Sequence, residues 1–143
     1  MFCVICATGG PSIIHLSEFS RRRAIAMHKK TFPVHSAIEV YRDEVSLARL
    51  ALACGTYKVC FFHLERAHVV SQHMTGRHVY VHWLMLLAGL RQADYREVLG
   101  QIPRMLASLL FSTLWVPRGN TGRARVNALQ QMPVPDDLRH LFS

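Results

Sequence analysis

The sequence predicts an all-α fold of two antiparallel helical hairpins, with an extended, proline-rich C-terminal tail packed on them. Four segments repeat apolar residues at steps of three and four, the spacing of one helix face. Short polar or glycine-containing links separate these segments, so consecutive helices should fold back on each other. No segment shows the clean period-two alternation that is typical of a strand.

The first two helices are predicted over residues 36–54 and 56–73. Ser36, with Glu39 three positions later, matches a capping box, and Gly55 is a natural stop because glycine takes a left-handed cap conformation at little cost. The residues expected to supply the apolar surface are Ile38, Tyr41, Val45, Ala48 and Leu52, then Val59, Phe62, Ala67, Val69 and Val70, with Leu64 on another side.

The third helix is predicted over residues 77–88 and the fourth from Asp94 onward. The third is apolar on most sides and should be central, with Gly89 as its cap. Asp94 with Glu97 three positions later is a start signal, and Pro103 should kink the fourth helix by removing a backbone hydrogen bond. The apolar stripe expected on the third helix is Val79, Trp83, Leu86 and Leu90, widened by Leu84 and Leu87. The stripe expected on the fourth helix is Val98, Ile102, Met105 and Leu109, flanked by Leu99, Leu106 and Leu110.

The helical pattern stops after Trp115. Residues 116–122 (VPRGNTG) have the composition of a loop, residues 132–137 (MPVPDD) are extended by proline, and a short final turn is predicted over residues 137–142. With its glycine turns and arginines at positions 118, 123 and 125, this loop could bind an anion or a phosphate. Turn formation with solvated arginines is the favoured interpretation, because no strand precedes the loop as in a P-loop.

Length and composition fit one globular domain, since half of the 143 residues are apolar. We predict a flexible basic N-terminal extension over residues 1–36 and a single helical domain over residues 37–143. The net charge is +8, and the extension holds five basic residues against one acidic residue. It lacks the aromatic platforms of a single-strand binder, so a solvated basic tail is favoured and no specific nucleic-acid site is expected.

The cysteines and the apolar runs predict a cytoplasmic protein with no membrane span. Cys3, Cys6, Cys54 and Cys60 lack zinc-ribbon spacing and are interpreted as small hydrophobic residues in a reducing compartment. The longest apolar runs reach about a dozen residues, whereas a span needs about 20. The N-terminus lacks the features of a signal peptide.

Five motifs, in one order, resemble a bacterial family of small proteins, the domain-of-unknown-function family 3703. The resemblance covers about residues 37–142, and the motifs lie at residues 63–68 (HLERAH), 78–86 (HVYVHWLML), 96–101 (REVLGQ), 115–122 (WVPRGNTG) and 132–138 (MPVPDDL). The resemblance implies hairpins similar to tetratricopeptide-type hairpins and a setting near heavy-metal resistance genes. It implies no activity. The chain departs from the family pattern at residues 122–125 (GRAR) and at Pro103.

Histidines cluster in the middle of the chain, with five of the nine between residues 63 and 82. His78 and His82 are four apart and share a face of the third helix, whereas Glu65 and His68 are three apart and share a face of the second. A Glu-x-x-His unit of this kind is used by di-metal carboxylate sites in helical bundles. If the two helices pack antiparallel, the two faces should converge.

A divalent metal site is one interpretation of this cluster, with Glu97 or Glu44 completing the ligand shell. Oxygen and nitrogen ligands of this kind suit iron, manganese or zinc. The competing interpretation is structural, in which His78 and His82 form hydrogen bonds to Gln101 or Glu97 across the helix interface. The predicted metal ligands are Glu65, His68, His78, His82 and Glu97.

The sequence therefore favours a non-enzymatic module that binds a metal ion or a protein partner in a setting of heavy-metal stress. No nucleophile–base pair and no G-x-S-x-G motif stand out, and His63 and His73 are expected at the surface. Two alternatives remain open. One is a non-haem metal-dependent enzyme that uses the same Glu/His site, and the other is a basic nucleic-acid-associated protein.

Overall fold

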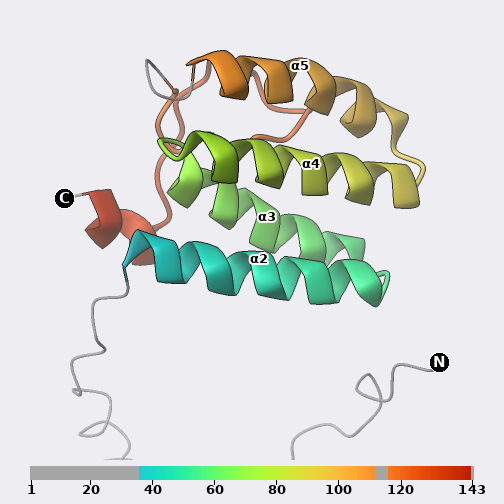
Figure 1. Cartoon of the computed structure of the whole chain (residues 1–143), viewed down its shortest axis with the longest axis horizontal. Helices are drawn as coiled ribbons and strands as arrows, with labels where there is room; N and C mark the ends of the chain where they lie inside the picture. Colours follow the sequence, from blue (N-terminus) through green and yellow to red (C-terminus); the bar gives the residue numbers. More distant parts are fainter. Residues whose placement is uncertain (1–35, 112–115, 143) are drawn as a thin grey trace, which may run out of the picture. The chain divides into compact units, whose positions relative to one another are not determined.

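The described part of the chain contains four α-helices that pack as two hairpins (Figure 1). The computed structural model describes residues 36–111 and 116–142, so the predicted extension before Ser36 lies outside the described residues, as do Cys3 and Cys6. Within that part no strand occurs, and α2 packs on α3, α3 on α4, and α4 on α5. The predicted all-α hairpin fold is confirmed. The elements are α2 (Ala37–Ala53), α3 (Tyr57–Ser71), α4 (Thr75–Arg91), α5 (Tyr95–Phe111) and a 3-10 helix, η1 (Asp136–Phe142).

Local signals set the helix ends as predicted. The capping box of α2 is complete, because the backbone N–H of Ser36 donates to Glu39 Oε2 at 2.8 Å and the N–H of Glu39 donates to Ser36 Oγ at 3.3 Å. Gly55 takes a left-handed φ of +72° after α2. The backbone N–H of Glu97 donates to Asp94 Oδ1 at 3.2 Å at the start of α5. These signals are contained in a few neighbouring residues, so the sequence shows them directly.

The core lies along α2, α3 and α4, and α3 is buried on two sides. Tyr41, Val45, Ala48 and Leu52 are buried as predicted. Leu64, which was assigned to another side of its helix, is fully buried, whereas Val59 and Phe62 are exposed, as is Ile38. Because α3 contacts both α2 and α4, a single apolar stripe does not describe which of its residues are buried.

Two predictions for α4 are wrong. The helix continues to Arg91, so Gly89 is not its cap but an interior residue. A Cβ on Gly89 would lie 3.2 Å from Val98 Cγ2, so the glycine allows α4 and α5 to approach closely. Trp83 and Leu90 are exposed, and the helix buries a different face, made of Val81, Leu84, Met85 and Ala88. With apolar residues on most sides, periodicity alone does not select the buried face.

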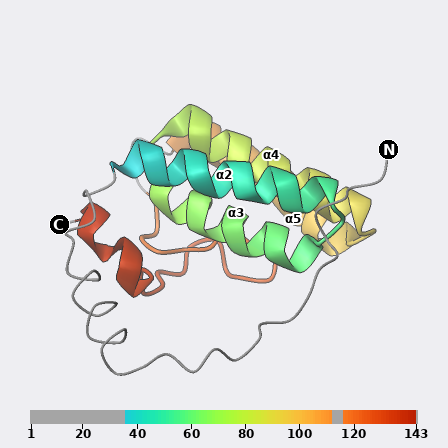
Figure 2. The same cartoon turned by 90° about the horizontal axis from the view of Figure 1, so that it is seen from below.

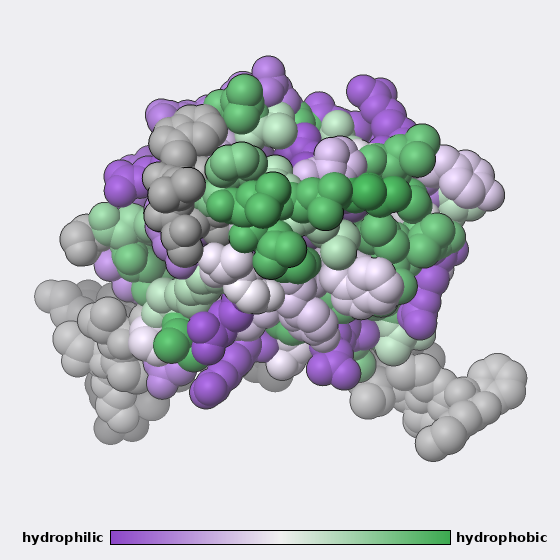
Figure 3. Space-filling model, turned by 45° about the horizontal axis from the view of Figure 1, so that its top comes forward, coloured by the Kyte–Doolittle hydropathy of each residue, from purple (hydrophilic) through white to green (hydrophobic). Residues whose placement is uncertain are grey.

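The orientation of α5 is opposite to the prediction. Its buried residues are the polar Glu97, Gln101 and Ser108, and the helix runs through Pro103. Most of the face predicted to be core is exposed, although Val98 and Met105 are partly buried: Leu99, for example, is 68% exposed. Figure 3 shows the resulting apolar patch on one face of the molecule, and its α5 members are Leu99, Ile102, Leu106, Leu109, Leu110 and Phe111. The polar face is turned inward because the tail and α4 supply hydrogen-bond partners for it.

Residues 116–135 run back along the helices without regular structure, and η1 follows near the end where α2 begins (Figures 1 and 2). Gln72 Nε2 donates to the carbonyl of Pro117 at 2.9 Å. Arg66 holds η1 through two bonds to the carboxylate of Asp137, the shorter at 2.6 Å, and Leu138 joins the core. The predicted final turn is confirmed as η1. No helix in the described part is both long and apolar enough to cross a membrane.

Candidate metal centre

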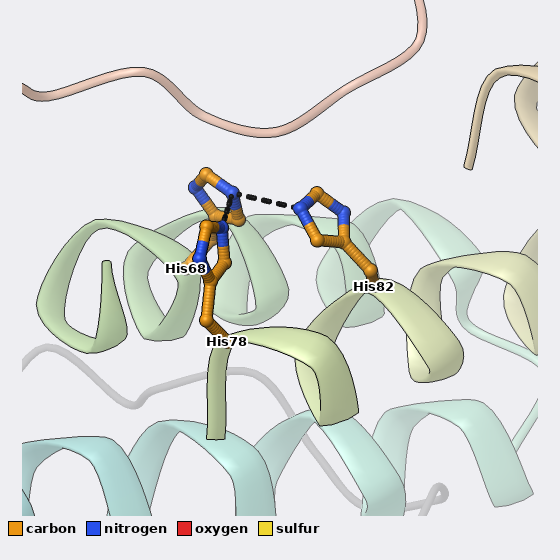
Figure 4. Close-up of side chains that lie close together, drawn as sticks. All are labelled: His68, His78 and His82. Carbon is orange, nitrogen blue, oxygen red and sulfur yellow. Dashed lines mark hydrogen bonds between the residues drawn. The ribbon is translucent and has the colours of Figure 1, made fainter. Parts of the chain in front are cut away.

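Three histidine side chains converge in the interior of the helical unit (Figure 4). His68 comes from α3, and His78 and His82 come from successive turns of α4. The Nε2 atom of His68 lies 2.8 Å from that of His78 and 3.2 Å from that of His82. All three rings are buried. The four-residue spacing on α4 and the packing of α4 on α3 therefore bring three potential nitrogen ligands to one point.

The tautomer of His82 is set by Gln101. The Nε2 group of Gln101 donates to Glu97 Oε1 at 2.6 Å and to the carbonyl of Gly122 at 3.0 Å. Both of these partners only accept, so the amide oxygen of Gln101 is the atom that faces His82, with Oε1 2.6 Å from Nδ1. An amide oxygen needs a donor. His82 therefore carries its proton on Nδ1 and has a bare Nε2.

The tautomer of His68 is set by the tail. Its Nδ1 lies 2.7 Å from the backbone carbonyl oxygen of Asn120, which can only accept a hydrogen bond. Asn120 is itself fixed, because its Nδ2 donates to the carbonyls of Asn127 and Gln130 at 2.9 and 2.7 Å. His68 thus also has its proton on Nδ1. Two unprotonated Nε2 atoms, those of His68 and His82, face each other at 3.2 Å.

All three rings are neutral at physiological pH. Burial, reinforced by His82, lowers the pKa of His78 to about 3. Burial lowers the pKa of His82 to about 4, against the opposing hydrogen bond to Gln101. His68 is fully buried against the other two rings, and its pKa is held well below the usual value. The cluster therefore does not take up an additional proton at this pH, and the shortest contact between two of its rings is the hydrogen bond of 2.8 Å between Nε2 of His78 and Nε2 of His68.

The two glutamates predicted as ligands are held elsewhere. Glu65 Oε1 accepts from Arg123 at 3.1 Å, and burial raises the pKa of this carboxyl group. Glu97 is fully buried, and its carboxylate accepts from Arg123 Nε at 3.1 Å and the backbone N–H of Ala124 at 3.2 Å. Of the five predicted ligands, the structure brings together the three histidines and leaves both carboxylates outside the cluster.

Glu97 nevertheless acts on the cluster from a distance. Its carboxylate accepts a hydrogen bond from the amide nitrogen of Gln101, and the amide oxygen of Gln101 accepts one from His82 Nδ1. A buried carboxylate thus fixes the orientation of the imidazole through one intermediate residue. Such outer-shell partners are usual around ligating histidines, where they set the tautomer. Glu44, the other candidate carboxylate, is paired with His63 at 2.7 Å and with Arg66 at 2.5 Å. His73 is exposed, as predicted, and His63 is partly buried.

The sequence alone did not reveal what the tail loop does. Asn120 and Gly122 lie in a stretch predicted as a turn, yet both contact the histidine cluster or its partners. Arg123 was expected to be solvated, and instead it bridges Glu65 and Glu97 and stacks 3.7 Å from the centre of the Phe61 ring. Two glycines at residues 119 and 122, both with φ above +70°, are the signal that the loop is tightly shaped.

We expect Gly122→Ala to lower the free energy of unfolding by about 2 kcal/mol. The glycine has φ +77°, a conformation that costs alanine about 1–2 kcal/mol, and an added Cβ would lie 2.6 Å from Cδ2 of His68. Gly76→Ala is the matched control, because its Cβ would meet open space in α4. Urea unfolding followed by circular dichroism compares them. Equal stability of the two variants would contradict the placement of the tail against His68.

The chain belongs to the family described as protein of unknown function (DUF3703), whose model matches residues 35–142. That range includes all three clustered histidines, Gln101 and the tail loop. The resemblance seen in the five sequence motifs is thereby confirmed. No curated protein and no solved structure matches the chain.

Proposed function

We propose that this member of the DUF3703 family is a metal-binding module that holds one divalent transition-metal ion on the Nε2 atoms of His68, His78 and His82. One observation carries the proposal: two buried Nε2 atoms without protons face each other at 3.2 Å. Each of these two rings already donates its only proton to a fixed oxygen. His68 Nε2 can accept one hydrogen bond, from His78 Nε2 at 2.8 Å, and the lone pair of His82 then faces the pair without a proton. A cation between the rings is coordinated by these lone pairs.

The distances between the Nε2 atoms also support a divalent transition-metal ion such as zinc at this position. A tetrahedral zinc ion with Zn–N bonds of about 2.0–2.1 Å separates its nitrogen ligands by about 3.3–3.4 Å. The two Nε2 separations of 2.8 and 3.2 Å are close to this value. Small ring movements would open the triad to the required distance.

The ligand set narrows the choice of metal. Iron, manganese and zinc were considered with mixed carboxylate and imidazole ligands, but three neutral imidazoles with no carboxylate favour zinc and its neighbours cobalt, nickel and copper. The hydrogen bonds from His68 to the Asn120 carbonyl and from His82 to Gln101 are those that tune such sites. The setting of heavy-metal stress rests on the family resemblance.

Zinc titration of the untagged, full-length chain by calorimetry tests the proposal. We expect one ion per chain in the wild type. His78→Ala should lose stoichiometric binding, because it removes one of three ligands. His73→Ala is the matched control, since it removes an exposed histidine from the turn just before α4, and it should bind zinc like the wild type. Circular dichroism of each variant checks that the helices are intact.

Two outcomes would contradict the proposal. One is a folded wild-type protein that takes up no zinc, cobalt, nickel or copper above the level of the His78→Ala variant. The other is equal loss of binding in His73→Ala and His78→Ala, which would place the metal at the surface. Either result would leave the histidine cluster as a structural hydrogen-bond network, the alternative open at the level of the sequence.

A further inference from the structure

The geometry points to a second ligand at this site: a small organic monoanion, with a carboxylate-type head and an apolar body, that completes the coordination of the ion. The inference rests on the proposed metal function. Three histidines leave at least one position of a four-coordinate ion unfilled by protein, which is the arrangement of sites that bind an exchangeable ligand. What fills that position depends on the space and the charge around it.

The space is a pocket of about 170 Å³ that opens beside the triad. His68, His78 and His82 form part of its wall. Most of the other lining residues are apolar, and the exposed ones among them are Ala107, Phe111, Ala128 and Leu129. At about 30 Å³ of liquid volume per water molecule, the volume corresponds to roughly five or six waters. A body of several carbon atoms fits this space, and a halide ion leaves most of it empty.

The charge selects an anion. Neutral imidazoles do not compensate a divalent ion, so the coordinated ion keeps its full double charge. No described acidic residue lines the pocket, and its one charged side chain is Arg104. This guanidinium donates to the carbonyl of Val126 and is half-buried, and burial lowers its pKa. An anionic head bound to the metal therefore lies in a field of positive charge with low screening.

The apolar wall selects the body of the ligand. Each methylene group moved from water into such a pocket improves binding by about fourfold. A chain of four to six carbons with one carboxylate combines metal coordination, attraction to Arg104 and apolar burial. A dianion, or a molecule with a polar group at both ends, loses the contribution from apolar burial. The ligand class is thus a short-chain fatty acid or a similar small amphiphilic anion.

The probe is the cobalt-loaded, full-length protein, because the visible spectrum of Co²⁺ reports a change of ligand. Acetate, butanoate and hexanoate are titrated in turn. We expect each to change the spectrum, with the dissociation constant falling by about fourfold per added methylene until the pocket is filled. Chloride at the same concentration serves as the comparison anion and should bind more weakly than hexanoate.

Two variants outside the triad separate the contributions. Arg104→Met should weaken all three carboxylates by about tenfold, since it removes one charged partner. Ala107→Trp should fill the apolar part of the pocket, so that hexanoate weakens and acetate is little changed. Neither residue is a proposed metal ligand, and both variants should therefore keep one cobalt ion per chain.

The outcomes distinguish the two proposals. If neither zinc nor cobalt binds the wild type, the metal function fails and this inference fails with it. If cobalt binds stoichiometrically but no carboxylate alters its spectrum, the metal function stands and the inference is overturned. Affinities that are independent of chain length, or unchanged in Arg104→Met, also overturn it, because they would describe an open aqueous ion rather than a shaped pocket.

Discussion

Replacing Arg123 by methionine is expected to lower the free energy of unfolding by about 3–5 kcal/mol. Arg123 Nε lies 3.1 Å from Oε2 of Glu97, a side chain with no exposure to solvent. Methionine keeps much of the apolar contact with the Phe61 ring but removes the charge. A buried carboxylate without its cation is costly, because the interior screens charge poorly and offers little solvation in return.

Arg125→Met is the control for this prediction. Arg125 is adjacent in the sequence and also approaches Glu97, at 3.8 Å, but its side chain is 50% exposed and pairs mainly with Asp94. An exposed ion pair contributes little to stability, so this variant should be nearly as stable as the wild type. Both are measured by urea unfolding at pH 7.

A double variant separates the charge from the shape. Arg123→Met combined with Glu97→Gln removes both charges and should recover part of the lost stability, since no unpaired carboxylate remains. If Arg123→Met costs no more than Arg125→Met, the buried ion pair does not hold the tail.

Acid should unfold the metal-free protein well above the pH at which most carboxylates titrate. His68, His78 and His82 stay neutral when folded, because burial holds the pKa of each below its ordinary value of 6.5, to about 3 for His78 and about 4 for His82. In the unfolded chain all three take protons below that value. The unfolded state thus binds more protons, and stability falls as pH falls.

The size of the effect follows from the number of histidines. Each ring that stays neutral costs up to about 1.4 kcal/mol per pH unit below its unfolded pKa, so three rings together cost about 4 kcal/mol per unit. The loss extends from about pH 6.5 down to about pH 4, where His82 begins to take a proton in the folded state. Asp94 and Asp137, whose pKa values are lowered by Arg125 and Arg66, add to the loss only at lower pH.

Urea unfolding of the apo protein at a series of pH values measures this slope. His78→Gln should lower the slope of the unfolding free energy against pH by the amount that corresponds to one proton taken up on unfolding. His73→Ala removes an exposed histidine and should leave the slope close to that of the wild type. A wild-type stability that is flat between pH 6.5 and 4.5 would show that the three rings are accessible to protons. That result would contradict the buried, neutral triad.

The sequence predicts the helices of this fold well because their signals are local. Ser36 with Glu39, Gly55 and Asp94 each act through residues within one turn, and each is found as expected. The orientation of α5 is different, because it depends on distant partners. Its apolar stripe suggested a core-facing surface, yet Gln101 and Glu97 face inward, since His82 and the tail satisfy their hydrogen bonds.

The same distinction applies to the candidate site. The four-residue spacing of His78 and His82 was enough to place them on one face, and helix packing brought His68 to them. Glu65 was predicted as a ligand from its spacing to His68, and Glu97 as a carboxylate that completes the ligand shell, but Arg123 binds both. It lies 58 residues after Glu65 and 26 after Glu97. No local pattern shows a partner so far along the chain.

The order of the site's components along the chain has a consequence for how it is made. The three imidazoles belong to residues 68–82, whereas the oxygens that orient two of them belong to Gln101 and Asn120. A ribosome therefore delivers the rings before the groups that fix their tautomers. We therefore expect the proposed ion binding only from the completed protein, after the tail loop has docked and both oxygens are in place.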